Sequence, residues 1–309
     1  MSVSKMEILA TGLRFPEGPV VMADGSVLVV EIGAGRVTRI AGDGTRSTVA
    51  ETGGGPNGAA IGPDGALYVC NNGGFRWTED AAGLRPAGQA DDYVTGSIQR
   101  VDLATGAVTT LYTASDQAPL KGPNDIVFDS DGGFWITDHG KVRHREMDLG
   151  ALCYGRVDGS GLKEVVFPIH SPNGIGLSPD ETTLWTVETF TARLWAFSIV
   201  GPGEVAVEVR PGARHGGHLA ASPTGLRGFD SLAVEADGSV AVAQIYTGAI
   251  VVFAPDGSVV EEVPMPDAYA TNIAFGGEDM TTAYITLSST GQLVRMPWSR
   301  PGLRLPFNA

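Results

Sequence analysis

Six polar residues recur at equivalent places in a repeated sequence pattern, and all six carry side-chain oxygen atoms. Each stands at the start of a short apolar segment and is followed seven positions later by an aspartate in a turn. These corner residues are Glu17, Asn57, Asn124, Asn173, Asp230 and Asn272. Carboxylate and amide oxygens suit a hard divalent cation, with Ca²⁺ the first choice and Mg²⁺, Mn²⁺ or Zn²⁺ as alternatives. Because buried polar groups cost free energy unless they are paired, one bound cation would explain their presence.

The segments around the corner residues form one repeated module. "FPEGPVVMADGSVLVVE", "GPNGAAIGPDGALYVCN" and "GPNDIVFDSDGGFWITD" share a polar corner, an apolar strand, an Asp-containing turn and a second strand. A third strand follows in each copy, and a fourth follows in all but the last, whereas the N-terminal stretch "EILATGL" is a spare strand. Modules of roughly 50 residues with four short strands are typical of β-propellers. The sequence therefore predicts an all-β fold in a single domain over 1–309. That domain is a six-bladed β-propeller of four-stranded antiparallel blades, in which the N-terminal strand closes the last blade.

In such a ring the first strand of each blade lines the central channel, so the corner residues should meet at one end of it. Glu17 and Asp230 would bring two negative charges, and the asparagines would bring neutral carbonyl oxygens. The alternative interpretation is that Asn and Asp at these places only cap turns.

Polar residues at the ends of the second strands lie beside the corners in this fold. Asn71 and Asp138 are the ones that long loops follow, and we expect them to contact substrate. The loop over 73–95 is long enough to act as a lid over the site, although an inert insertion is the alternative, and its Trp77 is a further predicted substrate contact. His139 directly follows Asp138, and a substrate contact is predicted for it as well. The chain lacks the Gly-x-Ser-x-Gly elbow of a serine hydrolase.

The composition excludes several classes of partner. The formal net charge of −14 disfavours binding to nucleic acid or to anionic membranes. No apolar run is long enough to span a bilayer, and the N-terminus does not resemble a signal peptide, so a cytoplasmic location is expected. Cys70 and Cys153 form no motif and are expected to be two buried thiols. The sequence leaves the oligomeric state open.

The corner motifs resemble the gluconolactonase/regucalcin (senescence marker protein) family of six-bladed propellers. The resemblance rests on "FPEGPV", "GPNDIVFDSDGGFWITD", "SPNGIGLSPD" and "TNIAFGGEDMTTAYIT", and it runs from about Phe15 to the last blade. It implies a single divalent metal at the channel mouth and hydrolysis of a lactone, which is a small-molecule substrate. Four residues match the metal-binding positions of the family: Glu17, Asn124, Asn173 and Asp230.

The resemblance also suggests roles in the reaction. Asp230 is the candidate base or nucleophile, and Glu17 is the second catalytic candidate. Asn57 and Asn272, the remaining corner residues, are expected to contact substrate. Animal regucalcins carry an Arg two residues before the third-blade Asn, where this chain has Gly122 preceded by Lys121, so Lys121 is a further candidate contact.

The same four metal-binding positions resemble the calcium site of diisopropyl fluorophosphatase. A phosphotriesterase-like activity is therefore the alternative to a lactonase, and a non-catalytic ligand-binding propeller is the third interpretation.

Overall fold

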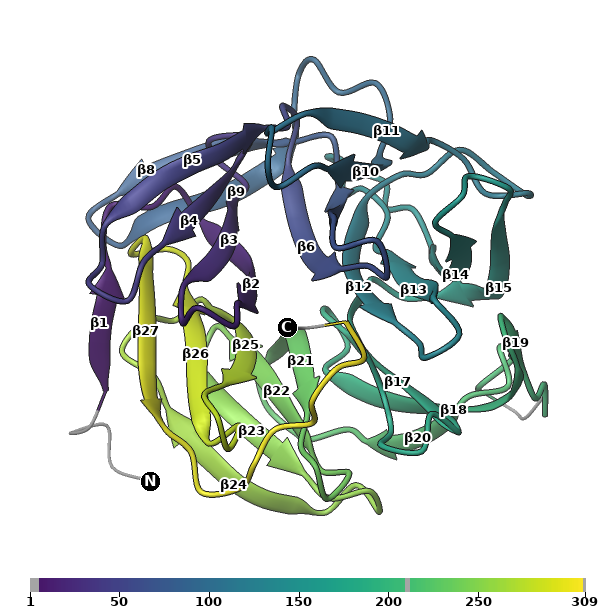
Figure 1. Ribbon diagram of the computed structural model, residues 1–309. Coiled ribbons are helices and arrows are strands. Elements are labelled where there is room, and N and C mark those ends of the chain that lie inside the picture. Colours follow the sequence, from purple (N-terminus) through teal and green to yellow (C-terminus); the bar gives the residue numbers. More distant parts are fainter. Residues whose placement is uncertain (1–5, 209–211, 308–309) are drawn as a thin grey trace.

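The structure confirms the six-bladed β-propeller. The computed structural model describes residues 6–208 and 212–307. The regular secondary structure of those residues consists of β-strands. Six antiparallel sheets follow one another around a ring, as Figure 1 shows. The first strand of each blade lies nearest the axis of the ring.

The first three blades take their strands in chain order apart from one insertion. Blade 1 contains β2 (Pro16–Val21), β3 (Val27–Glu31), β4 (Arg36–Ile40) and β5 (Arg46–Glu51). Blade 2 contains β6 (Pro56–Ile61), β7 (Leu67–Asn71), β10 (Ser97–Val101) and β11 (Val108–Tyr112). Blade 3 contains β12 (Pro123–Phe128), β13 (Gly133–Asp138), β14 (Gly150–Arg156) and β15 (Leu162–Ile169). The insertion in blade 2 forms a separate hairpin of β8 (Phe75–Asp80) and β9 (Gly83–Gln89).

The last three blades complete the ring. Blade 4 contains β16 (Pro172–Leu177), β17 (Thr183–Glu188), β18 (Arg193–Gly201) and β20 (His218–Ala221), with the short β19 (Glu204–Val205) also paired to β18. Blade 5 contains β21 (Gly228–Val234), β22 (Val240–Ile245), β23 (Ala249–Phe253) and β24 (Val259–Pro264). Blade 6 contains β25 (Ala270–Gly276), β26 (Thr282–Leu287), β27 (Gln292–Pro297) and β1 (Glu7–Ala10). The sequence places the fourth strand of blade 4 at "VAVEVR" (205–210). Part of that segment lies outside the described residues, and β20 pairs with β18 along the blade instead.

The ring closes as the sequence predicts. Strand β1 pairs antiparallel with β27, with Glu7 opposite Arg295 and Ile8 opposite Val294. The Arg295 guanidinium donates two hydrogen bonds to the Glu7 carboxylate, of 2.9 and 3.0 Å. The first strand of the chain therefore completes the last blade, so no blade is left with an unpaired third strand.

A β-bulge lies at the corner of every blade. The pairing register between the first and second strands shifts beside Glu17, Asn57, Asn124, Asn173, Asp230 and Asn272. Four of these strands begin with proline, which lacks an N–H and is tolerated at the first position of a strand. A bulge bends the strand and changes the direction of its side chains. The bulges thus explain how a polar corner residue can leave the alternation of an otherwise apolar strand.

The segment after β27 covers the other end of the channel. It runs back across the ring and ends near the axis (Figure 1). The Leu303 N–H donates a 2.9 Å hydrogen bond to the carbonyl of Val234, and the Phe307 ring lies 5.9 Å from that of Phe128. Leu303, Leu305 and Phe307 pack against the apolar clusters of different blades, so this segment joins blades that are not neighbours in the chain.

Glycine follows the corner residue where neighbouring inner strands approach most closely. A Cβ atom on Gly174 would lie 2.5 Å from the backbone nitrogen of Leu232, and one on Gly58 would lie 2.5 Å from the carbonyl oxygen of Asn124. These contacts involve backbone atoms of the next blade, which have little room to move. Glycine at these two positions lets the corner residues converge.

We expect Gly174→Ala to destabilise the protein, because the added methyl group must push blade 5 away from blade 4. Overpacking of this kind costs about 1–3 kcal/mol, and the thermal midpoint should fall by several degrees. Gly161→Ala is the matched control, since no atom lies within 4 Å of its Cβ position. Thermal melts followed by circular dichroism would measure both. Equal midpoints for the two variants would contradict the close approach of these strands.

Candidate functional site

A pocket opens at the end of the channel where the corner residues meet. It has a volume of about 280 Å³. Five of the six corner residues line it, and they are Glu17, Asn57, Asn124, Asn173 and Asp230. The structure therefore brings together the four residues predicted to bind metal.

Glu17 is nearly inaccessible to solvent, with 2% of its surface exposed. Its Oε2 atom accepts hydrogen bonds from the Gly18 N–H at 2.9 Å and from Asn272 Nδ2 at 2.7 Å. Its Oε1 atom is buried and has no hydrogen-bond partner. Burial raises the pKa of the Glu17 carboxyl, and the hydrogen bonds oppose that rise only in part.

The two asparagines predicted to bind metal show the same deficit. Asn173 donates a 3.0 Å hydrogen bond from Nδ2 to the Thr189 hydroxyl, which leaves its Oδ1 without a partner. The Oδ1 atom of Asn124 is also buried and unpaired. Unpaired buried acceptors are rare in folded proteins and call for a ligand that supplies positive charge.

The charges of the channel repel one another. Burial is the largest cause that raises the pKa of Asp230 well above its usual range, followed by the nearby negative charge of Glu17, while a hydrogen bond from Asn173 opposes the rise. Asp125, one residue after Asn124, lies in a smaller cavity further along the channel. Burial raises its pKa to about 7, and the charge of Glu17 adds to the rise. The channel thus favours either protons or a cation.

These residues fit a divalent cation. Three buried acceptor oxygens lack a donor, and the partly exposed carboxylate of Asp230 lies in the same pocket. The set comprises two carboxylates and two amides rather than a carboxylate-rich cluster, and no group of three or more His, Cys, Asp or Glu side chains poised for metal occurs in the described residues. Oxygen ligands of mixed charge are typical of Ca²⁺ sites.

The structure separates the other two corner residues. Asn57 is buried and lines the pocket, as predicted. Asn272 instead donates to Glu17 and lines the smaller cavity, so it orients a candidate ligand.

The side chains of Asn71 and Asp138 form hydrogen bonds with backbone groups and do not line the pocket. The Asn71 amide accepts from the Gly55 N–H at 2.9 Å and donates to the carbonyl of Gly53 at 2.8 Å. The Asp138 carboxylate accepts from the N–H groups of Lys121 and Gly122, at 2.8 and 2.6 Å. Neither residue lines the pocket. The structure gives their predicted substrate contacts no support, because their polar atoms already fix the segments that precede the corners.

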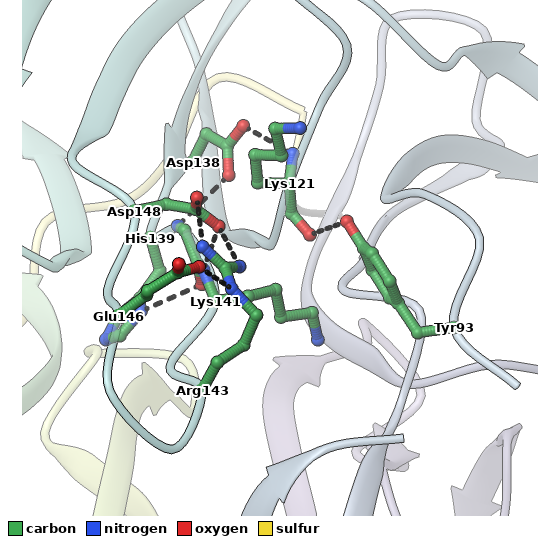
Figure 2. Close-up of polar contacts among 9 residues, drawn as sticks. Tyr93, Lys121, Asp138, His139, Lys141, Arg143, Glu146 and Asp148 are labelled. Carbon is green, nitrogen blue, oxygen red and sulfur yellow. Dashed lines mark hydrogen bonds and ion pairs between the residues drawn. The ribbon is translucent and has the colours of Figure 1, made fainter. Parts of the chain in front are cut away.

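Lys121 and Trp77 also lie outside the pocket lining. The side chain of Lys121 is exposed, and its carbonyl accepts a 2.7 Å hydrogen bond from the Tyr93 hydroxyl (Figure 2). Trp77 packs on Phe15, with ring centroids 5.3 Å apart, and on Phe75, at 5.9 Å. It therefore supports two rings that do line the pocket.

The segment predicted as a lid contributes directly to the pocket. Phe75, Pro86, Gly88 and Gln89, from the β8–β9 hairpin, all line it. Closure of this hairpin over a ligand stays a prediction.

His139 lines the pocket, as predicted for a substrate contact. Its Nδ1 lies 3.3 Å from the Gly140 carbonyl, and its ring packs on that of Phe190 at 5.7 Å. Burial lowers its pKa to about 4, so the imidazole is neutral at physiological pH and offers hydrogen bonds rather than charge.

Sequence reasoning missed two residues of the pocket wall, Asn72 and Lys141. Each has 2% of its surface exposed, and both line the pocket. Asn72 follows the predicted Asn71, and Lys141 lies in the loop after Asp138. No local sequence signal marks a lysine that folds inward from a loop rich in charged residues.

Cys70 and Cys153 are buried free thiols, as predicted. No helix in the described ranges is long and apolar enough to cross a membrane.

Comparisons with known proteins show which family the chain resembles. A model of the SMP-30/gluconolactonase/LRE-like region matches residues 15–289. Lactonase drp35 of Staphylococcus saprophyticus is 30% identical over 212 residues, which is 68% of this chain and 57% of the relative, so the match spans little more than half of that protein. Lactonase drp35 of Staphylococcus aureus strain USA300 is 29% identical over 211 residues, with the same coverage.

Solved structures share the fold. A gluconolactonase of Xanthomonas campestris superposes with a TM-score of 0.73 at 23% identity, over 96% of this chain and 89% of that one. The calcium-binding protein regucalcin of Agrobacterium tumefaciens gives a TM-score of 0.71 at 19% identity, over 97% and 98%.

The buried acids of the channel should contribute less to the thermal stability of the cation-free protein as the pH rises from about 4 to about 7, whereas the lowered pKa of His139 acts in the opposite direction below about pH 6.5. The folded pKa values of Glu17, Asp125 and Asp230 lie above their unfolded values, so the folded state binds more protons and loses that advantage as the pH rises through this window. Melts in EDTA would measure the slope, and Asp125→Asn should reduce it near pH 7.

Added Ca²⁺ should raise the midpoint most at the upper end of the window, since it binds the ionised carboxylates of the folded state. A pH slope that Asp125→Asn leaves unchanged, or a midpoint that Ca²⁺ leaves unchanged, would contradict this account of the site.

Proposed function

The chain belongs to the SMP-30/gluconolactonase/LRE-like family, and from that premise we propose that it is a metal-dependent lactonase. One observation carries the proposal: unpaired, buried acceptor oxygens of Glu17, Asn124 and Asn173 share a pocket with Asp230. Lactonases among the relatives and gluconolactonases among the similar folds support the choice of reaction.

Glu17, Asn124, Asn173 and Asp230 would hold the cation, which we propose to be Ca²⁺. The regucalcin fold relative, described as calcium-binding, and the oxygen-only ligand set support that choice. When bound, such an ion supplies polarisation of the lactone carbonyl and stabilises negative charge on its oxygen.

Asp230 is the proton acceptor in this proposal. It lines the pocket, and as a ligand of the cation its carboxylate would stay ionised at neutral pH and able to accept a proton. Water attacks the carbonyl carbon and passes a proton to Asp230. Cleavage of the ring C–O bond then leaves an alkoxide, which takes that proton back, and the product is a hydroxy acid.

The remaining residues position the reactants. Asn272 holds one oxygen of Glu17, so that the other oxygen faces the pocket. Asn57 and neutral His139 offer hydrogen bonds to the substrate from two neighbouring blades. The rings of Phe15, Phe75 and Tyr269 line the pocket and limit the access of bulk water.

Lactone hydrolysis should require a divalent cation and the Asp230 carboxylate. We expect EDTA to abolish proton release from a panel of γ- and δ-lactones, and Ca²⁺ to restore it. Mg²⁺, Mn²⁺ and Zn²⁺ are tested in parallel. Asp230→Asn should lower kcat by about 10³-fold or more, because an amide cannot accept the proton.

Calorimetry would show whether each variant still binds Ca²⁺, and Glu17→Gln should weaken that binding. Asp92→Asn removes an exposed carboxylate outside the pocket and serves as the control. Near-normal turnover by Ca²⁺-loaded Asp230→Asn would overturn the base assignment. Full activity in EDTA would overturn the metal dependence.

A further inference from the structure

One wall of the pocket has unused hydrogen-bond donor capacity, and two side chains supply it. Asn72 comes from the loop after β7 of blade 2, and Lys141 comes from the loop after β13 of blade 3. Both side chains are nearly completely buried and both line the pocket. Neither is a corner residue.

The orientation of the Asn72 amide follows from its neighbours. Its Oδ1 accepts hydrogen bonds from the Gly74 N–H at 2.8 Å and from Lys141 Nζ at 3.3 Å. Both neighbours are donors, so the oxygen must face them. The Nδ2 group is consequently left buried with no hydrogen-bond partner. A buried donor without an acceptor destabilises the fold, and a ligand oxygen would relieve that cost.

Lys141 has a spare donor beside this amide. Its Nζ donates to Asn72 Oδ1 and to the Gly74 carbonyl, the latter at 3.0 Å. An ammonium group has three N–H donors, and these are the two hydrogen bonds that Nζ makes among the described residues. The group also lies 4.5 Å from the ring centre of Phe75 and 5.0 Å from that of Tyr93.

The carboxylates near Lys141 are engaged elsewhere. Arg143 binds Asp148 through two hydrogen bonds of 2.8 Å, and Asp138 accepts backbone N–H groups. Figure 2 shows the Lys141 amine pointing away from the Arg143–Asp148 pair and toward Tyr93. No carboxylate of the described chain lies within 4 Å of Lys141 Nζ. Burial lowers its pKa to about 7, and Asp138 and Asp148 oppose that change.

The backbone around Lys141 is fixed before any ligand arrives. The Lys141 N–H donates to the Asp148 carboxylate at 3.1 Å, and its carbonyl accepts from the Asp148 N–H at 3.0 Å. Val142 and Met147 form a bridge in the same loop. The amine is therefore held at the pocket wall by a short loop with several internal hydrogen bonds.

We propose that Asn72 Nδ2 and Lys141 Nζ form a subsite for a carboxylate, and that the lactone opened by this protein carries an acid group. That the substrate is a lactone rests on the proposed function. That it carries a carboxylate rests on the side chains of Asn72 and Lys141. Two adjacent donors match the two oxygens of a carboxylate, and an anion, unlike a neutral hydroxyl, would hold the buried Lys141 amine in its protonated form.

The rest of the pocket lining supports an acid over a sugar. A polyhydroxylated lactone needs many hydrogen-bonding partners, because each unpaired hydroxyl loses its hydration. Much of this lining is apolar or aromatic: Phe15, Ile32, Phe75, Phe190, Ile245 and Tyr269. The carboxylates and the buried amides lie at the corner residues and at the Asn72–Lys141 wall, and His139, Gln89, Thr189, Tyr246 and Tyr269 add neutral polar groups. A compact acid-bearing lactone fits this division.

The test compares γ-butyrolactones that bear a carboxylate, directly or on a short arm, with their methyl esters. The Ca²⁺-loaded wild type should show a lower KM for the acids. Lys141→Met should raise that KM about 10- to 100-fold and change the KM of the esters less than about threefold, as expected for loss of a charged hydrogen bond. Asn72→Asp, which keeps the acceptor for Gly74 but removes the donor, should act in the same direction.

Lys163→Met is the matched control, since Lys163 is exposed on strand β15 outside the pocket. Thermal melts would show that each variant is folded. Calorimetry with the ring-opened dicarboxylates, such as hydroxyglutarate, measures the subsite without catalysis, and Lys141→Met should bind them about 10-fold or more weakly.

The outcomes separate the two proposals. Equal preference for acid over ester in the wild type and in both variants would overturn the subsite and leave the lactonase intact. Loss of dicarboxylate binding in Lys141→Met, with no lactone hydrolysed by the wild type, would support the subsite and overturn the lactonase. Absence of both hydrolysis and dicarboxylate binding in the Ca²⁺-loaded wild type would overturn both.

Discussion

The mutual repulsion of buried carboxylates at the channel axis is the constraint on which the rest of the structure depends. Glu17 and Asp230 share a pocket whose burial favours their neutral forms, and Asp125 adds a third acid further along the channel. Bulges and close inner strands bring these groups together against their repulsion. A fold that spends stability on such an arrangement gains a preformed site for positive charge, because the surrounding blades prevent the acids from moving apart.

The pocket divides its hydrogen-bonding capacity between two regions. The corner residues present acceptors that lack donors, whereas the Asn72–Lys141 wall presents the unpaired Nδ2 donor of Asn72 beside the Lys141 amine. The two regions therefore call for different partners. A cation suits the corner residues, and a negatively charged oxygen of the substrate suits the Asn72–Lys141 wall. The apolar rings between the two regions set no directional demand, so orientation is determined by the polar ends.

The sequence was sufficient for the fold and for the corner residues, because both repeat. A constant offset between corner and turn in six modules predicted the blades, the ring closure by β1 and the meeting of Glu17, Asn124, Asn173 and Asp230. The roles of residues that have no counterpart in the other modules were harder to predict. Asp138 looked like a substrate contact, yet it holds the backbone of Gly122. Lys141 was missed because its inward direction depends on Asp148 and Arg143, which interact only once the loop is folded.

The seam where the ring closes passes through the site itself. Glu17 belongs to blade 1 and Asn272 to blade 6, and their hydrogen bond joins residues 255 positions apart. The Ser288 hydroxyl crosses the same seam to the Pro16 carbonyl. A chain with only some of its blades assembled therefore has no complete set of ligands. Under the proposed function, cation binding would therefore require the finished ring, since a partly assembled ring cannot present Glu17, Asn124, Asn173 and Asp230 together.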